Sequence, residues 1–204
     1  MSFDKLKAWL DTGSINIFGL PMSGKDTVGV RLAEFLNARF LSSGMIIRQV
    51  EQELSQNLTG NGALIPTNQF YDIVLPYFKR TELRGYPLIL SSVGRWSGEE
   101  NEVIAAAERG GHPIKAAVLL DLTEDEAKAR RTASITTGDR GGRADDASEE
   151  VFETRLMEFR EKTIPVLKHY QELGLLITVD GSGTRDDVFS DVIKQLDAFT
   201  KANS

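Results

Sequence analysis

The sequence of 204 residues contains no cysteine and only two histidines, His112 and His169. Without cysteine there can be no disulfide framework and no zinc site built from thiolates. Two histidines are also too few for a histidine-rich metal site. The chemistry of this chain must therefore rest on carboxylates, hydroxyls, lysine, arginine and backbone groups.

Long apolar runs are also absent. No stretch approaches the roughly 20 consecutive apolar residues that span a bilayer. The first ten residues mix Asp4, Lys5 and Lys7 with apolar side chains, which predicts a short amphipathic helix rather than a signal peptide. We therefore expect a cytoplasmic protein that has no membrane partner.

Positive charge is in short supply, because 30 acidic residues outnumber 24 lysines and arginines and give a formal net charge of −6. Binding of nucleic acid depends on neutralisation of phosphates by basic side chains. The acidic balance therefore argues against nucleic acid, and against an anionic membrane surface, as a partner. A local basic cleft for a small anion is still compatible with it.

What the chain does contain is an alternation of short apolar runs with helical patterns. With 41% hydrophobic and 26% charged residues, this length suits one domain with a real core. Apolar positions at the helical period, such as Val28, Leu32 and Leu36, lie between the runs. Strands that alternate with helices need crossover connections, which predicts a parallel sheet covered on both faces. The predicted strands are 15–18, 86–90, 114–120 and 175–179, with Phe40-Leu41 as a candidate fifth.

Two stretches interrupt this alternation. Residues 44–84 form a long, mostly helical insertion that is broken at Thr59-Gly60-Asn61-Gly62. Residues 132–148 are polar and rich in glycine, aspartate and arginine. Loops of such length in a compact domain are usually functional lids or disordered.

A phosphate-binding loop is predicted after the first strand. The strand runs directly into Gly19-Leu20-Pro21-Met22-Ser23-Gly24-Lys25-Asp26-Thr27, and a helix follows. Glycine-rich backbone between a strand and a helix N-terminus points several N–H groups at one spot, where the helix dipole also favours an anion. Lys25 would then reach the outer phosphates. The usual pattern has Ser or Thr directly after the lysine, whereas Asp26 stands there and Thr27 comes next. The alternative interpretation is a coincidental glycine-rich turn.

This loop resembles that of adenylate kinases and their nucleoside monophosphate (NMP) kinase relatives. The resemblance implies an α/β fold of the P-loop NTP hydrolase type, with three layers and a five-stranded parallel sheet. It implies a single NMP kinase domain over residues 1–204, with its core at 1–43, 85–131 and 149–204, an NMP-binding lobe at 44–84 and a short lid at 132–148. It also implies Mg²⁺ as cofactor, ATP and an NMP as partners, and a monomer.

Further segments carry the resemblance in order along nearly the whole chain. They are Ser42-Ser43-Gly44-Met45-Ile46-Ile47-Arg48, Gly62-Ala63-Leu64-Ile65, Asp121-Leu122-Thr123 through Arg130, Arg143-Ala144-Asp145-Asp146, Arg155 and Gly181-Ser182-Gly183. Each segment that follows the phosphate loop is a weak signal alone. Their common order along the chain makes the resemblance specific.

The resemblance also assigns roles to residues. Phosphoryl transfer needs cations that converge on donor and acceptor phosphates, and arginine binds phosphate oxygens in a bidentate way without losing its charge. The implied catalytic residues are Lys25, Arg95, Arg130, Arg143 and Arg155. The implied ATP-binding residues are Gly19, Pro21, Met22, Ser23, Gly24, Lys25, Asp26, Thr27, Arg130 and Gly181. The implied NMP-binding residues are Ser43, Arg48, Ile65, Arg95 and Glu99. Arg160 and Arg185 are interpreted as ordinary surface arginines.

Several positions depart from the family's pattern. Ser91 stands where the family has an aspartate that organises the water shell of Mg²⁺. Ser134 replaces a second arginine one helical turn after Arg130, and Met22 replaces a phosphate-loop glycine and would restrict the backbone. Asp26 could offset the missing aspartate by holding metal-bound waters, because Mg²⁺ favours carboxylates and keeps several waters. Alternatively, Asp26 only favours the helix N-terminus electrostatically.

Glu99 stands where the family has a glutamine that reads adenine. Glutamine both donates and accepts hydrogen bonds, whereas an ionised glutamate only accepts them. If Glu99 reads the base, GMP or CMP should compete well with AMP, and Glu99→Gln should shift the preference toward AMP. Alternatively, Glu99 pairs with Arg95 or lies in solvent near Glu100.

The resulting prediction is an ATP-dependent NMP kinase that moves a phosphoryl group reversibly from ATP to an NMP, with AMP as the expected acceptor. Two alternatives remain from the sequence. One is a nucleotide-binding protein of the same fold that has lost catalysis, and the other is a P-loop kinase of a small metabolite. Retention of Lys25 and of the arginines favours activity.

Overall fold

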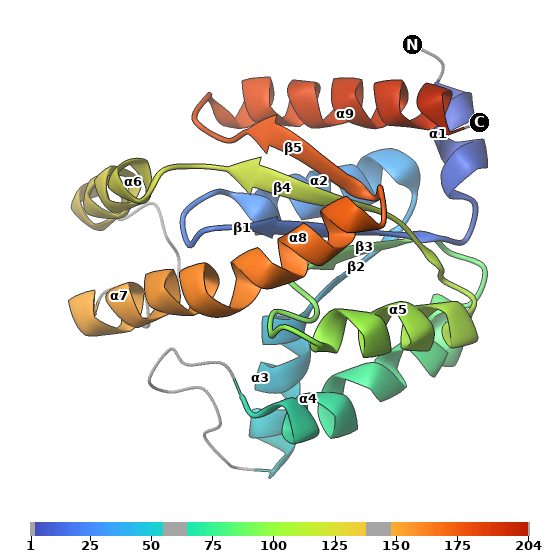
Figure 1. Ribbon diagram of the computed structural model, residues 1–204, viewed down its shortest axis with the longest axis horizontal. Helices are drawn as coiled ribbons and strands as arrows, with labels where there is room; N and C mark the ends of the chain where they lie inside the picture. The colour runs from blue at the N-terminus through green and yellow to red at the C-terminus, as the bar shows by residue number, and fades with distance from the viewer. Residues whose placement is uncertain (1–2, 55–64, 138–147, 204) are drawn as a thin grey trace.

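The computed structural model describes residues 3–54, 65–137 and 148–203. Within these residues, five parallel strands form one sheet in the order β2-β3-β1-β4-β5 (Figure 1). The strands are β1 (Ser14–Gly19), β2 (Arg39–Ser42), β3 (Leu88–Ser91), β4 (Ile114–Asp121) and β5 (Leu176–Asp180). The predicted strands are confirmed, and the candidate fifth at Phe40-Leu41 is β2.

One face of the sheet is covered by α1 (Phe3–Leu10), α2 (Lys25–Leu36) and α9 (Arg185–Ala202). Figure 1 shows α9 running along this face beside α1. Successive strand residues point to opposite faces, so Ile15 and Ile17 of β1 pack on this side. The predicted amphipathic helix contributes Leu6 and Leu10, both fully buried. Burying each such side chain stabilises the fold by about 1.5–3 kcal/mol.

The opposite face carries the larger cluster. It is covered by α5 (Glu99–Gly110) and α8 (Ile164–Glu172), and the helices of the 44–84 insertion pack against the same cluster. Phe18 of β1 points to this side and contacts Tyr170 of α8, with ring centroids 5.7 Å apart. The insertion contains α3 (Ser43–Leu54), α4 (Thr67–Val74) and the 3₁₀ segments η1 (Leu75–Lys79) and η2 (Thr81–Leu83). The sheet with helices on both faces confirms the three-layer α/β prediction.

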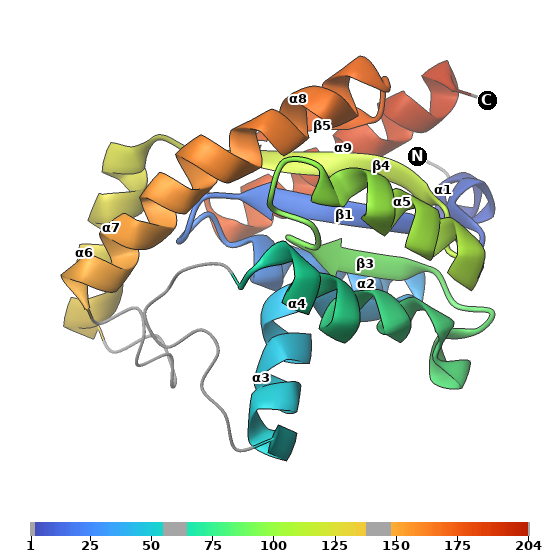
Figure 2. The ribbon, with the colours of Figure 1, turned by 60° about the horizontal axis from the view of Figure 1, so that its bottom comes forward.

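Two further helices lie beyond the carboxyl ends of β1 and β4. They are α6 (Glu124–Thr137) and α7 (Glu149–Glu158), and both views place them at the same end of the molecule (Figures 1 and 2). Ion pairs Arg131–Glu149 and Lys128–Glu153 join them. The first six residues of the predicted lid, 132–137, continue α6, and 138–147 lie outside the described residues.

A long helical ribbon connects this end of the molecule to the sheet. Figure 2 shows α7 continuing through a π-helical turn, η4 (Phe159–Thr163), into α8. Within the described part of the chain, no helix is both long and apolar enough to cross a membrane.

The topology places the functional site. Strand β1 is central, with β3 and β2 on one side and β4 and β5 on the other. In open α/β sheets, ligands bind outside the carboxyl ends of the strands, where the strand order changes direction. The carboxyl end of β1 is therefore the expected position, and the phosphate loop begins there.

Candidate active site

The phosphate loop bends tightly between β1 and α2. A Cβ atom on Gly19 would lie 2.5 Å from Ser23 Oγ and 3.0 Å from Leu120 O, so the strand can end this way only with glycine. Ser23 N donates to Leu20 O at 3.1 Å, which closes the turn. Gly24 caps α2 with φ +82°, a conformation that glycine adopts freely. The first N–H groups of α2 have no partner within the helix, so they face the loop.

Met22 adopts a left-handed backbone conformation in the middle of this loop, with φ +72°. For a residue with a Cβ this conformation costs of the order of 1–3 kcal/mol. The expected restriction is therefore present as strain, because methionine holds a conformation that suits glycine. The Met22 side chain is buried in a cluster with Leu20, Phe152 and Leu156, so packing against α7 offsets part of the strain.

Two polar groups of the loop are held by their own surroundings. Lys25 Nζ donates to Leu20 O at 3.4 Å, so the ammonium lies back over the loop. Ser91 Oγ, at the end of β3, donates to Asp26 Oδ1 at 2.6 Å. Asp26 is thus fixed at the first turn of α2 by the residue that stands in place of the family's aspartate. The carboxylate and the hydroxyl therefore lie together at one point of the site. In this chain α2 contributes the carboxylate and β3 the hydroxyl, the reverse of the family's pattern.

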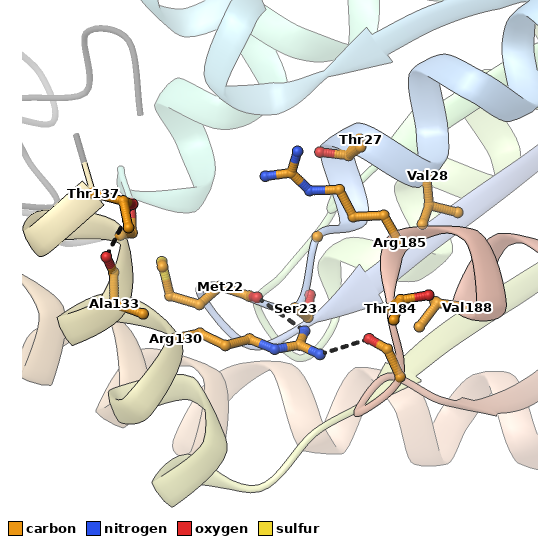
Figure 3. A pocket seen from close by; sticks show the side chains of 13 residues that line it. Met22, Ser23, Thr27, Val28, Arg130, Ala133, Thr137, Thr184, Arg185 and Val188 are labelled. Carbon is orange, nitrogen blue, oxygen red and sulfur yellow. Dashed lines mark hydrogen bonds between the residues drawn. The ribbon is translucent and has the colours of Figure 1, made fainter. Parts of the chain in front are cut away.

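A pocket of about 710 Å³ opens beside the loop (Figure 3). Its lining comes from the loop, α2, α6 and the start of α9: Met22, Ser23, Gly24, Thr27, Val28, Arg130, Ala133, Ser134, Thr137, Gly183, Thr184, Arg185 and Val188. The volume lies within the usual range for a small-molecule site. With the phosphate loop at one wall, the pocket suits a nucleotide whose phosphates lie at Ser23 and Gly24.

Arg130 ties the phosphate loop to the segment after β5. Its Nη1 donates to Met22 O at 3.4 Å, and its Nη2 donates to Gly181 O, Ser182 O and Gly183 O at 2.7, 2.9 and 3.1 Å. A Cβ atom on Gly181 would lie 2.7 Å from a backbone oxygen of β4, so this segment also needs glycine to lie so close. Of the predicted ATP-side residues, Met22, Ser23, Gly24, Thr27 and Arg130 line this pocket, and Gly181 is joined to it by the hydrogen bond from Arg130.

Arg185 is a pocket residue that sequence reasoning missed. The interpretation as an ordinary surface arginine is incomplete, because Arg185 is exposed and also lines the pocket. Figure 3 shows its side chain extending past Thr27, on the opposite side of the pocket from Arg130. The signal in the sequence was its place at the start of the last helix, directly after the Gly181 segment. Arg160 does lie at the surface, in an ion pair with Glu124.

Arg95 lies on the loop that follows β3, on the other side of the phosphate loop from the pocket. Asn16 in the centre of β1 holds this loop, because its Nδ2 donates to Val93 O at 2.8 Å. Thr163 of the π turn donates to Arg95 O at 3.3 Å. Hydrogen bonds from Asn16 of β1 and from Thr163 of η4 therefore both hold the backbone around Arg95.

The electrostatics around Arg95 favour an anion. Burial and the nearby guanidinium of Arg155 lower the pKa of Arg95 to about 10, against the opposing effect of Glu99, Glu158 and Asp26. Arg95 thus stays charged at neutral pH, but at an electrostatic penalty. An anion bound beside Arg95 and Arg155 would offset that penalty, which is the pattern expected of a binding site for a charged ligand.

The remaining NMP-side residues take separate positions. Ser43 begins α3, and its Oγ donates to Ser92 O at 2.8 Å, beside the Arg95 loop. Arg48 is exposed on α3 and lies back toward the helix start, since a Cβ on Gly44 would be 3.1 Å from its Nη1. Ile65 is buried in the cluster beneath α3 and α4. Arg143 lies outside the described residues, as do Gly62, Ala63 and Leu64 of the segment that ends at Ile65.

Both oxygens of Glu99 accept hydrogen bonds from the chain itself. Oε2 accepts from Arg95 N and Trp96 N, each at 3.0 Å, and Oε1 accepts from Thr67 Oγ1 at 3.0 Å. Burial raises the pKa of the Glu99 carboxyl, and these hydrogen bonds oppose the shift. One lone pair on Oε1 is left by this arrangement. Base reading through it remains a prediction.

Comparison with named proteins identifies the family. An adenylate kinase of Phocaeicola vulgatus is 30% identical over 192 residues, which cover 88% of this chain and 96% of that protein. An adenylate kinase of Thermus thermophilus is 30% identical over 191 residues, covering 89% and 96%. One of Bacteroides fragilis is 29% identical over 191 residues, covering 90% and 98%.

The chain belongs to the adenylate kinase family.

No protein-family model matches the chain. As a member of the adenylate kinase family, it is an ATP-dependent NMP kinase, and the two alternatives left open by the sequence are not favoured. The departures from the family's pattern can now be placed. Ser134, in place of the second arginine, lines the same pocket as Arg185. The start of α9 thus contributes a cation to the pocket that Ser134 of α6 also lines.

Proposed function

We propose that this member of the adenylate kinase family transfers the terminal phosphoryl group of ATP to AMP, reversibly. The observation that supports the proposal is that a pocket and a charged arginine both lie near the first turn of α2. The pocket of about 710 Å³ lies on one side. On the other side lies Arg95, close enough to Asp26 for the carboxylate to raise its pKa. A donor and an acceptor bound at these sites would meet over Lys25.

On the donor side, the proposal assigns binding to the residues that the sequence predicted, with Arg185 added. The N–H groups of the phosphate loop and the α2 dipole would hold the outer phosphates, and Lys25 would turn from Leu20 O toward them. Arg130 would contact the nucleotide from α6. Because the transfer needs charge neutralisation rather than covalent chemistry, these residues bind and orient the donor and stabilise charge in the transition state.

On the acceptor side, the proposal assigns the phosphate of AMP to Arg95 and Arg48, with Ser43, Ile65 and Glu99 around the nucleoside. Arg155, which lies near Arg95, and Arg143 would close on the transferring group. Closure would also exclude water, which protects the phosphoryl group from hydrolysis.

Adenylate kinases generally use Mg²⁺ with ATP, and the residues present fit it. Among the described residues, no group of three or more His, Cys, Asp and Glu side chains is placed to hold a metal ion. Mg²⁺ needs no such cage, because it keeps several waters and binds through one or two carboxylates and the substrate phosphates. We propose that Asp26 holds it through water beside Thr27. When bound, the ion would neutralise charge on the donor phosphates.

The Asp26 proposal predicts a change in metal dependence. In Asp26→Gly, the Mg²⁺ concentration for half-maximal activity should rise about tenfold, the scale of about 1.4 kcal/mol of lost interaction. The melting temperature should fall by a few degrees only, because the first-turn carboxylate is worth about 0.3–1 kcal/mol, glycine in a helix costs about 0.5–1 kcal/mol and the hydrogen bond from Ser91 is lost. Titration of activity with Mg²⁺ measures the first effect and thermal unfolding the second.

Asp125→Gly is the matched control, since Asp125 is an exposed carboxylate in the first turn of α6. It should leave the Mg²⁺ dependence unaltered. If Asp26→Gly behaves like this control, Asp26 serves only the helix N-terminus.

The acceptor is tested by a panel of monophosphates. ATP and the enzyme are combined with AMP, GMP, CMP, UMP or dTMP in turn, and the diphosphates formed are measured. We expect AMP to give the highest kcat/KM. A preference for GMP or CMP would replace AMP as the acceptor and leave the kinase assignment intact. We also propose that the protein is a cytoplasmic monomer.

A further inference from the structure

The loop that carries Arg95 is joined to the 44–84 insertion by one buried carboxylate. Glu99 is 4% exposed and accepts from Arg95 N and Trp96 N with one oxygen and from Thr67 Oγ1 with the other. Thr67 is the first residue of α4, whereas Glu99 is the first residue of α5. Three segments of the chain therefore meet at a single side chain.

We propose that Glu99 is a positioning residue for the acceptor: it fixes the backbone of Arg95 and couples that loop to α4 through Thr67. This inference rests on the proposed function, because Arg95 is the proposed acceptor anchor. Glu99 acts through Arg95, whose guanidinium orientation depends on where its backbone is held. The hydrogen bond from Thr67 fixes the position of α4 relative to Arg95.

The geometry argues for this role beyond ordinary helix capping. A glutamate in the first turn of a helix usually turns toward N–H groups of its own helix start. Glu99 turns instead to the two N–H groups that precede the helix, beside the anion site. Its neighbour Glu100 provides a comparison, because Glu100 Oε2 accepts only from Gly98 N, at 2.7 Å, and has no hydrogen bond to α4 in the described residues. Glu99 alone of the two connects Arg95 with the insertion.

The position also carries a stability penalty. Burial raises the pKa of the Glu99 carboxyl above its ordinary value, so the folded state binds the proton more tightly than the unfolded state does. Stability therefore falls as the pH rises between the unfolded and folded pKa values. Tyr71 lies near Glu99, Glu102 and Glu100, whose charges add to burial in raising the pKa of its hydroxyl, and Arg95 is the cation that opposes the shift of Glu99.

Thr67→Val is the sharpest test, because it removes the hydroxyl and keeps the side-chain shape. We expect KM for AMP to rise about fivefold, the scale of a typical net hydrogen bond in a protein, while kcat and KM for ATP change less than about twofold. Glu99→Leu should raise KM for AMP by more than about tenfold on the same scale. Glu99→Leu also leaves two partly buried N–H groups unpaired. If Glu99→Leu fails to fold, Thr67→Val tests the inference on its own.

Glu99→Gln separates positioning from base reading. Glutamine can accept both N–H groups with its oxygen and donate to Thr67 with its amide, so it should rescue most of the AMP affinity lost in Glu99→Leu. It should also raise the melting temperature at any pH where Glu99 is ionised, because the desolvated charge is gone. The preference among monophosphates should stay as in the unaltered protein. A shift toward AMP would mean that Glu99 reads the base and would overturn the positioning role.

Glu102→Gln is the control, since Glu102 is exposed on the same turn of α5; its kinetic constants should be unaltered. Equal KM for AMP in the unaltered protein and in Thr67→Val would overturn the inference while leaving the kinase intact. A lower melting temperature with kcat reduced and KM constant would mark a merely structural role. If the unaltered protein forms no diphosphate from any monophosphate, the proposed function itself fails.

Discussion

Replacing Lys25 by alanine should lower kcat for diphosphate formation by about a hundredfold or more. The ammonium is the cation that reaches the outer phosphates of the donor, where charge develops during transfer. Loss of one such charge-assisted contact removes about 2–4 kcal/mol of transition-state stabilisation, and each 1.36 kcal/mol is about tenfold in rate. The measurement is kcat at saturating ATP and AMP.

The fold should tolerate this change. The hydrogen bond from Lys25 Nζ to Leu20 O is long, at 3.4 Å, so its loss should leave the melting temperature close to that of the unaltered protein. Lys194→Ala is the matched control, because Lys194 is an exposed lysine that pairs with Asp191 on α9. It should keep full activity. A Lys25→Ala enzyme with unaltered kcat would place the donor phosphates elsewhere.

Arg95→Ala should have an effect of similar size on the acceptor side. We expect kcat/KM for AMP to fall by about a hundredfold or more, the scale of about 2–4 kcal/mol for one such contact. KM for ATP should change little, because Arg95 is not among the residues that line the donor pocket. Arg95→Lys should rescue only part of the loss, since an ammonium cannot bind a phosphate with a planar fork. Steady-state kinetics with AMP and ATP varied separately distinguish the two effects.

Arg160→Ala is the control for this series. Arg160 is an exposed arginine that forms a two-nitrogen ion pair with Glu124, and exposed pairs of this kind contribute about 0–1 kcal/mol to stability. Its kinetic constants should match those of the unaltered protein. If Arg95→Ala also kept its kcat/KM for AMP, the acceptor phosphate would have to be bound by other residues.

The sheet could be predicted from the sequence because its strands are short, apolar and separated by helical patterns. Ile15 and Ile17 alternate with Asn16 along β1, and the apolar spacing of Val28, Leu32 and Leu36 defines the buried side of α2. One irregular spacing in the sequence coincides with an irregular turn in the fold. The apolar positions Phe159 and Ile164 are five residues apart, and the structure has its π-helical turn at Phe159–Thr163, where the hydrogen bonds run from i to i+5.

The contacts that organise the site could not be predicted in the same way. Ser91 and Asp26 are 65 residues apart, and Thr67 and Glu99 are 32 apart. No local pattern links such pairs, because they meet only when β3 lies beside β1 and α4 packs near α5. Arg185 was missed for the same reason: its role as a lining residue depends on where α9 starts relative to the phosphate loop.

Met22, the strained residue of the loop, shows the same difference between local pattern and tertiary contact. Sequence reasoning correctly expected Met22 to restrict the backbone, but the packing that accompanies the strain was visible only in the fold. Phe152 and Leu156 come from α7, far along the chain, and bury the Met22 side chain. A departure from a motif can therefore be located from the sequence, whereas the contact that makes it tolerable is a property of the tertiary structure.

The most direct test of the account is to supply the enzyme with Mg²⁺ and ADP alone. If the two anion sites bind a donor and an acceptor nucleotide and exchange a phosphoryl group between them, the enzyme should convert two ADP into one ATP and one AMP. Separation of the nucleotides over time should then give ATP and AMP in equal amounts, and Lys25→Ala should slow the appearance of both. Tight binding of ADP with no ATP formed, or release of inorganic phosphate in place of ATP, would contradict the account.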